Sequence, residues 1–185
     1  MAESTLILDG IWGRPWRWGR LRRRIVESGG AAEIFRYDCW GRVEFEELGR
    51  RLAGEIRQRG GEVNLVGFSM GGLVVRAAHL VDRTLPIRRA VFLNSPLRGS
   101  WLAKLLPWPG IRQMRPGSAF MRAIEGAEWT APTLSVWCPL DLMVIPGTSA
   151  RWEEAGECVC CWVPAHIWPV YSRRVHERVV EFLKE

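Results

Sequence analysis

The sequence lacks a long hydrophobic run, a secretory leader pattern and an even set of cysteines. No apolar stretch in its 185 residues approaches the roughly 20 residues that a membrane-spanning helix needs. An acid, Glu3, precedes the first short apolar run, whereas a secretory signal has a basic start and a longer apolar centre. These absences predict a cytoplasmic protein that does not span a membrane.

The five cysteines, among them Cys39 and Cys138, are an odd number, which argues against a disulfide framework. The other three form the pattern Cys158-x-Cys160-Cys161, which could bind a metal. This pattern lies in an apolar run typical of a strand, where only Cys158 and Cys160 would share a face. We therefore expect no metal site, and reduced thiols that act as small buried hydrophobes.

Length and composition favour one globular domain over residues 1–185, with 48% hydrophobic and 25% charged residues. Basic residues exceed acidic ones by 26 to 20, partly through a cluster at positions 20 and 22–24. We expect these arginines on the solvated face of a helix whose Leu21, Ile25 and Val26 pack on a sheet. No nucleic-acid partner is expected, because no reading motif accompanies them. Contact with anionic lipid stays an alternative.

Short apolar runs alternate with amphipathic stretches along the whole chain. This alternation predicts an α/β fold with a parallel sheet and helices on both faces. The expected strands are 5–11, 33–38, 63–69, 89–94, 133–138 and 158–163. The expected helices are 16–28, 44–59, 71–82 and 168–184, with at least one more between 100 and 127.

The third expected strand ends in G-F-S-M-G-G, residues 67–72, and a helix follows at once. This is the strand, sharp turn and helix that a G-x-S-x-G nucleophile elbow requires. Ser69 would take a strained backbone conformation there, and Gly67 and Gly71 would let strand and helix approach closely. A glycine-rich turn without catalysis is the plain alternative.

A serine nucleophile needs a base, and the sequence has only three histidines. His166 follows the last expected strand, in a loop at the same sheet edge as the elbow. His79 and His176 fall in the middle of expected helices, where surface or helix-packing roles are expected. His166 is therefore the predicted base.

The base needs a carboxylate to orient it, which in proteins with this elbow lies between the serine and the histidine in sequence. Asp141 meets this requirement because it follows the fifth expected strand, next to the loop of His166. A local turn is the plain alternative for Asp141. Asp82 ends a helix and Asp38 precedes the elbow, so both fit less well.

An oxyanion formed during acyl transfer needs two backbone donors. The amide of Met70 supplies one from a helix N-terminus. The second is expected in the loop after the first strand, from the amide of Ile11, with Trp12 as the second choice.

With these residues in place, the chain resembles the small bacterial lipases and esterases of the α/β-hydrolase superfamily, the minimal lipases included. Segment 67–72 looks like the family's elbow, 94–100 (N-S-P-L-R-G-S) is similar to its T-P-H-x-G-S loop, and 115–120 (R-P-G-S-A-F) to its P-G-S-x-F segment. The pattern Asp141-x-x-Val144-x-Pro146 resembles its acid loop, and His166 its base. The resemblance implies a minimal α/β-hydrolase fold with strand order 2-1-3-4-5-6.

One position departs from the family pattern. The family usually has His-Gly after the first strand, where this chain has Asp9-Gly10. That histidine normally braces the oxyanion loop, so an acid there needs another brace. Our hypothesis is that Arg14 or Arg17 pairs with Asp9.

The 11 tryptophans bear on the substrate. Trp12, Trp16, Trp18, Trp101 and Trp108 fall in segments that should border the catalytic edge, although any single one could simply pack the core. As a group they favour an apolar acyl group or a transient contact with a membrane surface, and Trp12, Trp101 and Trp108 are the candidate substrate-binding residues.

The sequence thus predicts a serine hydrolase that cleaves carboxylic esters, with short to medium acyl chains on a small-molecule or lipid substrate. No cofactor or metal is expected, and the oligomeric state is left open. A thioesterase or an acyltransferase would use the same triad. A non-catalytic hydrolase-fold protein that binds a lipid or a partner is the alternative from another class.

Overall fold

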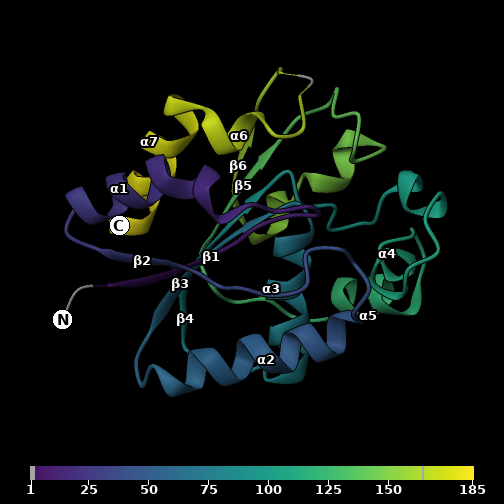
Figure 1. The fold of residues 1–185 in the computed structure, drawn as a ribbon, viewed down its shortest axis with the longest axis horizontal. Coiled ribbons are helices and arrows are strands. Elements are labelled where there is room, and N and C mark those ends of the chain that lie inside the picture. The colour runs from purple at the N-terminus through teal and green to yellow at the C-terminus, as the bar shows by residue number, and fades with distance from the viewer. Residues whose placement is uncertain (1–2, 164) are drawn as a thin grey trace.

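Six parallel strands form one sheet in the order β2-β1-β3-β4-β5-β6, which confirms the predicted order (Figure 1). The computed structural model describes residues 3–163 and 165–185. The strands are β1 (Ser4–Leu8), β2 (Ala31–Ile34), β3 (Val63–Phe68), β4 (Ile87–Leu93), β5 (Thr133–Trp137) and β6 (Gly156–Cys160). Because the strands are parallel, their carboxyl ends share one edge, here called the carboxyl edge.

Helices cover both faces of the sheet (Figure 1). One face carries α1 (Gly19–Glu27), α6 (Trp168–Tyr171) and α7 (Arg173–Lys184), and the other carries α2 (Phe45–Gln58), α3 (Met70–Val81) and α5 (Ala119–Glu125). The remaining short helices are α4 (Pro109–Gln113), η1 (Pro15–Trp18), η2 (Trp101–Lys104), η3 (Gly147–Ala150) and η4 (Glu153–Ala155). None of the described helices combines the length and the apolar character that crossing a bilayer requires.

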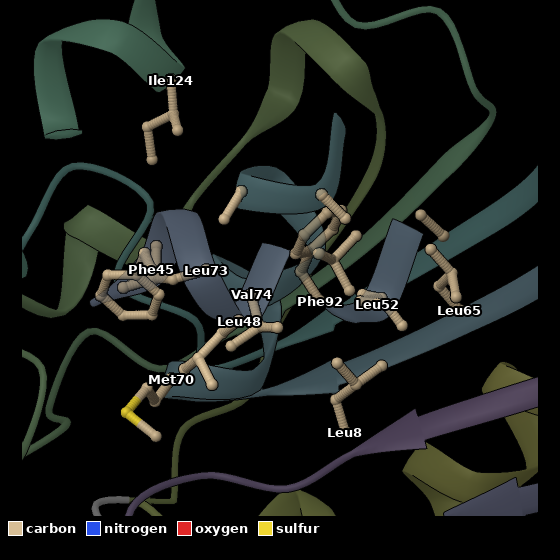
Figure 2. Close-up of a cluster of buried hydrophobic side chains, with 14 of the residues drawn as sticks. Leu8, Phe45, Leu48, Leu52, Leu65, Met70, Leu73, Val74, Phe92 and Ile124 are labelled. Carbon is tan, nitrogen blue, oxygen red and sulfur yellow. The ribbon is translucent and has the colours of Figure 1, made fainter. Parts of the chain in front are cut away.

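Alternate residues of the strands supply the two cores. In β1, Leu6 and Leu8 pack in the core with α2 and α3, whereas Ile7 packs in the core with α1 and α7. Figure 2 shows Leu8 and Phe92 of the sheet in the first of these cores. All six residues of β3 are buried, as expected of a parallel strand that is covered on both faces.

Several element bounds differ from those predicted. β1 ends at Leu8 rather than at residue 11, because the Asp9 carboxylate accepts the amides of Gly10 and Arg14 and turns the chain. The predicted helix 168–184 is two helices, since Ser172 is extended and its hydroxyl accepts the Val175 amide, which caps a new helix. Strands β2, β4 and β6 all begin earlier than predicted.

Two predictions about side-chain burial were wrong. Val26 of α1 is 56% exposed, because only Leu21 and Ile25 fall on the face of α1 that packs against the sheet. Cys160 is exposed rather than buried, because it ends the edge strand β6 on its outer side. The cysteines are free thiols, and no group of three metal-binding side chains occurs among residues 3–163 and 165–185.

The close packing of α2 on α3 depends on Gly49. A Cβ at Gly49 would lie 2.6 Å from the backbone carbon of Ala77, whereas a Cβ at Gly54 of the same helix would meet nothing within 4 Å. We expect Gly49→Ala to lower the free energy of unfolding by about 2–3 kcal/mol through overpacking. Gly54→Ala should raise it by about 0.5–1 kcal/mol through helix propensity. Urea denaturation measures both, and equal effects would contradict this packing.

Candidate active site

Ser69 stands where β3 ends and α3 begins. Its backbone has φ 54° and ψ −122°, a left-handed conformation that is strained for a residue with a side chain. The two flanking glycines make the turn sterically feasible. A Cβ at Gly67 would lie 2.5 Å from the Gly72 Cα, and a Cβ at Gly71 would run into the Leu8 carbonyl. Ser69 is therefore held at the centre of the carboxyl edge.

His166 and Asp141 are hydrogen-bonded to each other at the same edge. The distance between His166 Nδ1 and Asp141 Oδ2 is 2.7 Å. The Asp141 side chain is almost fully buried, and its Oδ1 accepts the amides of Met143 at 2.7 Å and Val144 at 3.0 Å. Because the carboxylate can only accept hydrogen bonds, it fixes the His166 tautomer that carries its proton on Nδ1.

The loop that carries Asp141 is tied to the loop after β4. The Ser100 hydroxyl donates to the Met143 carbonyl and accepts the Ile145 amide, both at 3.0 Å. The Trp101 amide also donates to the Ile145 carbonyl, at 2.8 Å. These bonds position the acid loop from outside its own strand.

His166 lies beside the elbow. Its ring centroid is 4.9 Å from that of Phe68, the residue that precedes Ser69. Asn94, at the end of β4, donates from its side-chain amide to the His166 carbonyl at 3.0 Å. No hydrogen bond joins Ser69 to His166, both of which are described residues. The structure thus joins Asp141 to His166 directly and packs the His166 ring against the residue that precedes Ser69.

The loop after β1 lies against Ser69. A Cβ at Gly10 would be 2.8 Å from the Ser69 Cβ. The Trp12 amide is already used, because it donates to the Cys39 carbonyl at 2.8 Å. This leaves Ile11 as the predicted second donor, and Met70, the other predicted donor, is the first residue of α3.

Asp9 is braced by Arg17 and not by the side chain of Arg14. Arg17 Nε and Nη2 donate to the two Asp9 oxygens at 2.8 and 2.7 Å, and Asp9 is 3% exposed. The Tyr37 hydroxyl donates to the Asp9 carbonyl. Burial raises the pKa of Tyr37 well above its ordinary value, so the hydroxyl keeps its proton. This network occupies the place of the family's histidine.

The other two histidines are buried in helices. His79 stacks edge-on against Trp129, and burial, followed by the charge of Arg76, lowers the pKa of His79 to about 4. His176 bonds the Val170 carbonyl through Nε2, and burial lowers its pKa as well. Both have helix-packing positions rather than surface ones, and neither lies at the carboxyl edge.

Of the five tryptophans predicted near the edge, Trp16 in η1 is 73% exposed, and the other four differ in their exposure. Trp12 and Trp101 are about half exposed, at 49% and 52%, in the loops after β1 and β4. Trp108 is half-buried against the α2 and α3 core. Trp18 is fully buried in the other core and is not exposed at the carboxyl edge, which corrects its placement there.

Sequence reasoning missed three residues of the site. Tyr37 and Ser100 act by hydrogen bonds to loops that are distant in sequence, and no local pattern marks Tyr37, whereas Ser100 closes the segment 94–100 that resembles a family loop. Asn94 carried a weak signal, because it opens the segment 94–100 that resembles a family loop. It has φ 45°, a conformation that asparagine tolerates better than most residues.

The sheet order and the strained serine between strand and helix define an α/β-hydrolase fold. A family model described as the alpha/beta hydrolase family matches residues 9–181, and the chain belongs to this family. No curated protein matched the chain.

Several solved structures share the fold. The mature lipase BlEst2 of Bacillus licheniformis is 15% identical with a TM-score of 0.76, and the match covers 97% of this chain and 92% of that chain. The monoacylglycerol lipase of Paleococcus ferrophilus is 18% identical with a TM-score of 0.75, and covers 97% and 93%. A bromoperoxidase from Bacillus anthracis is 15% identical with a TM-score of 0.72, and covers 100% and 93%. At these identities the likeness shows the fold alone.

The brace on Asp9 predicts different effects for two neighbouring arginines. We expect Arg17→Met to lower the free energy of unfolding by about 3 kcal/mol, because it leaves a buried carboxylate without its cation. Arg14→Met should change it by less than about 0.5 kcal/mol, because only the Arg14 backbone amide contacts Asp9. Chemical denaturation of both variants checks this. Equal losses of unfolding free energy would show that the two Arg17 hydrogen bonds to Asp9 do not brace the loop.

Proposed function

We propose that this protein hydrolyses carboxylic esters of apolar acyl groups through an acyl-enzyme on Ser69. The observation that carries the proposal is the Asp141–His166 hydrogen bond of 2.7 Å, at the edge where Ser69 is held in a strained turn. A buried carboxylate that orients an imidazole beside a serine is the arrangement that activates a hydroxyl. Family membership supports hydrolase chemistry.

In the proposed reaction, Ser69 Oγ bonds to the ester carbonyl carbon while its proton moves to His166 Nε2. The carbonyl electrons move onto oxygen, and the amides of Met70 and Ile11 stabilise that oxyanion. Collapse of the intermediate breaks the bond to the alcohol, which leaves with the proton from Nε2. Water then repeats the sequence on the acyl-enzyme and releases the acid.

Asp141 has an orienting role in this scheme. Its Oδ2 holds the proton on His166 Nδ1, which leaves Nε2 free to accept the proton of Ser69. It also stabilises the imidazolium that forms. The apolar tryptophans Trp12 and Trp101 at the edge favour an apolar acyl group over a sugar or a peptide.

Removal of the nucleophile tests the proposal. A chain-length series of p-nitrophenyl esters should be hydrolysed by the wild type, and Ser69→Ala should lose roughly 10⁴-fold or more in kcat. Ser28→Ala is the matched control, because Ser28 ends α1 at the opposite edge and should keep full activity. A wild type that leaves every ester intact would refute the ester hydrolase while leaving the fold untouched.

Two further experiments separate the alternatives. An acyltransferase should convert most of the acyl-enzyme to a new ester when an alcohol is added, whereas the proposed hydrolase should release mainly the free acid. A fluorophosphonate probe should label the wild type and not Ser69→Ala. Failure to label a well-folded wild type would instead favour a non-catalytic binding protein.

A further inference from the structure

The exposed large apolar side chains of this protein are concentrated in one region. We call that region the rim, and it comprises the connections after the strands at residues 9–18, 35–44, 94–118, 138–152, 161–163 and 165–171. Of the fourteen exposed large apolar residues in the described chain, all but Val26 and Val81 belong to the rim. The rim members are Trp12, Trp16, Trp40, Trp101, Leu105, Leu140, Leu142, Met143, Ile145, Trp162, Trp168 and Tyr171. Scattered exposure would not produce this distribution.

The rim is one connected surface around Ser69, because backbone hydrogen bonds join its loops. The Trp12 amide bonds the Cys39 carbonyl, and the Gly110 amide bonds the Gly41 carbonyl at 3.0 Å. The Trp101 amide, in the connection after β4, donates to the Ile145 carbonyl in the connection after β5. Figure 1 shows the connections after β4 and β5 beyond the strand ends, whereas α6 of the rim lies beside α1 and α7 on one face of the sheet.

The rim also carries an excess of positive charge. Its sequence contains nine arginines and lysines against four acids, and two of these cations, Arg98 and Arg151, pair with Glu154 and Glu153 just beyond it. Two of the acids, Asp9 and Asp141, are buried. The cations lie among the aromatic rings: Lys104 Nζ is 3.7 Å from the Trp101 ring centroid, and the Arg42 guanidinium is 5.4 Å from that of Trp40.

We propose that the rim docks on the surface of an anionic lipid bilayer and presents Ser69 to ester substrates held there. Tryptophan rings and cationic side chains are the groups that prefer the headgroup region, where the rings insert and the cations meet anionic lipid. This inference rests on the proposed function, and it adds that the ester substrate lies in a lipid bilayer rather than free in solution.

A second copy of the chain fits the rim poorly. Docking two rims face to face would bring together two surfaces that each carry more cations than acids. Lysine is also depleted at the centre of protein interfaces, whereas Lys104 lies directly on the Trp101 ring. An anionic surface complements both features.

Vesicle sedimentation tests the proposal with the Ser69→Ala protein, which should not consume lipid. This protein should bind vesicles of phosphatidylcholine with phosphatidylglycerol, and binding to pure phosphatidylcholine or at high salt should be at least about 10-fold weaker. Adding Trp16→Ser, Leu105→Ser and Trp162→Ser, the three most exposed positions, should lower the partition coefficient about 100-fold. The control pair Val26→Ser and Val81→Ser, which are exposed apolar positions off the rim, should leave binding unchanged.

The same variants separate docking from catalysis. With Ser69 intact, the triple rim variant should hydrolyse a water-soluble p-nitrophenyl ester at the wild-type rate. Vesicle binding without any ester hydrolysis would leave docking in place and refute the proposed function. Absence of binding to anionic vesicles, equal binding by the rim and control variants, or a dimer in sedimentation velocity that the rim variant abolishes would each overturn the docking proposal.

Discussion

The whole site depends on how closely α3 approaches the ends of β1 and β3. At Gly67 and Gly71 the space for a Cβ is already taken by the backbone of Gly72 and by the Leu8 carbonyl. The helix therefore starts directly at the strand end, and Ser69 must adopt φ 54° to connect them. That single constraint fixes the serine and the first amide of α3 relative to the sheet, and the other groups of the site are placed around them.

Those other groups come from loops that are held by contacts with one another rather than by their own strands. Ser100 anchors the acid loop, Asn94 anchors the backbone of His166, and Cys39 holds the Trp12 amide. The Asp9–Arg17 ion pair braces the loop after β1, as a histidine does in the small lipases and esterases that this chain resembles. A buried ion pair is an expensive brace unless its remaining lone pairs are satisfied, and the amides of Gly10 and Arg14 satisfy them here.

Much of this arrangement could be predicted from sequence because its signals are local. Apolar periodicity predicted a parallel sheet, and the resemblance to α/β-hydrolases implied its strand order. The two glycines marked the turn at Ser69, and chain order placed Asp141 and His166 in neighbouring loops. Their catalytic roles stay a prediction. The choice of Arg17 over Arg14 and the part played by Tyr37 could not be predicted, because both depend on how η1 and the loop after β2 meet in space. The burial of Arg76 could not be predicted for a related reason. Its helix, α3, packs on several sides, so this charged side chain is only 2% exposed.

The basic composition follows from the same dependence on loops. Only two of the 26 basic residues are lysines. A planar guanidinium can grip a carboxylate with two bonds, stack on indole and donate to several carbonyls, and a compact ammonium does none of these as well. Arg17 holds Asp9, the Arg76 guanidinium lies 4.9 and 4.7 Å from the ring centroids of Trp129 and Trp152, and Arg115 bonds the carbonyls of Ala103 and Leu106. Arginine thus stabilises the loops that connect the elements of this small fold. The exposed arginines also give the rim most of its positive charge.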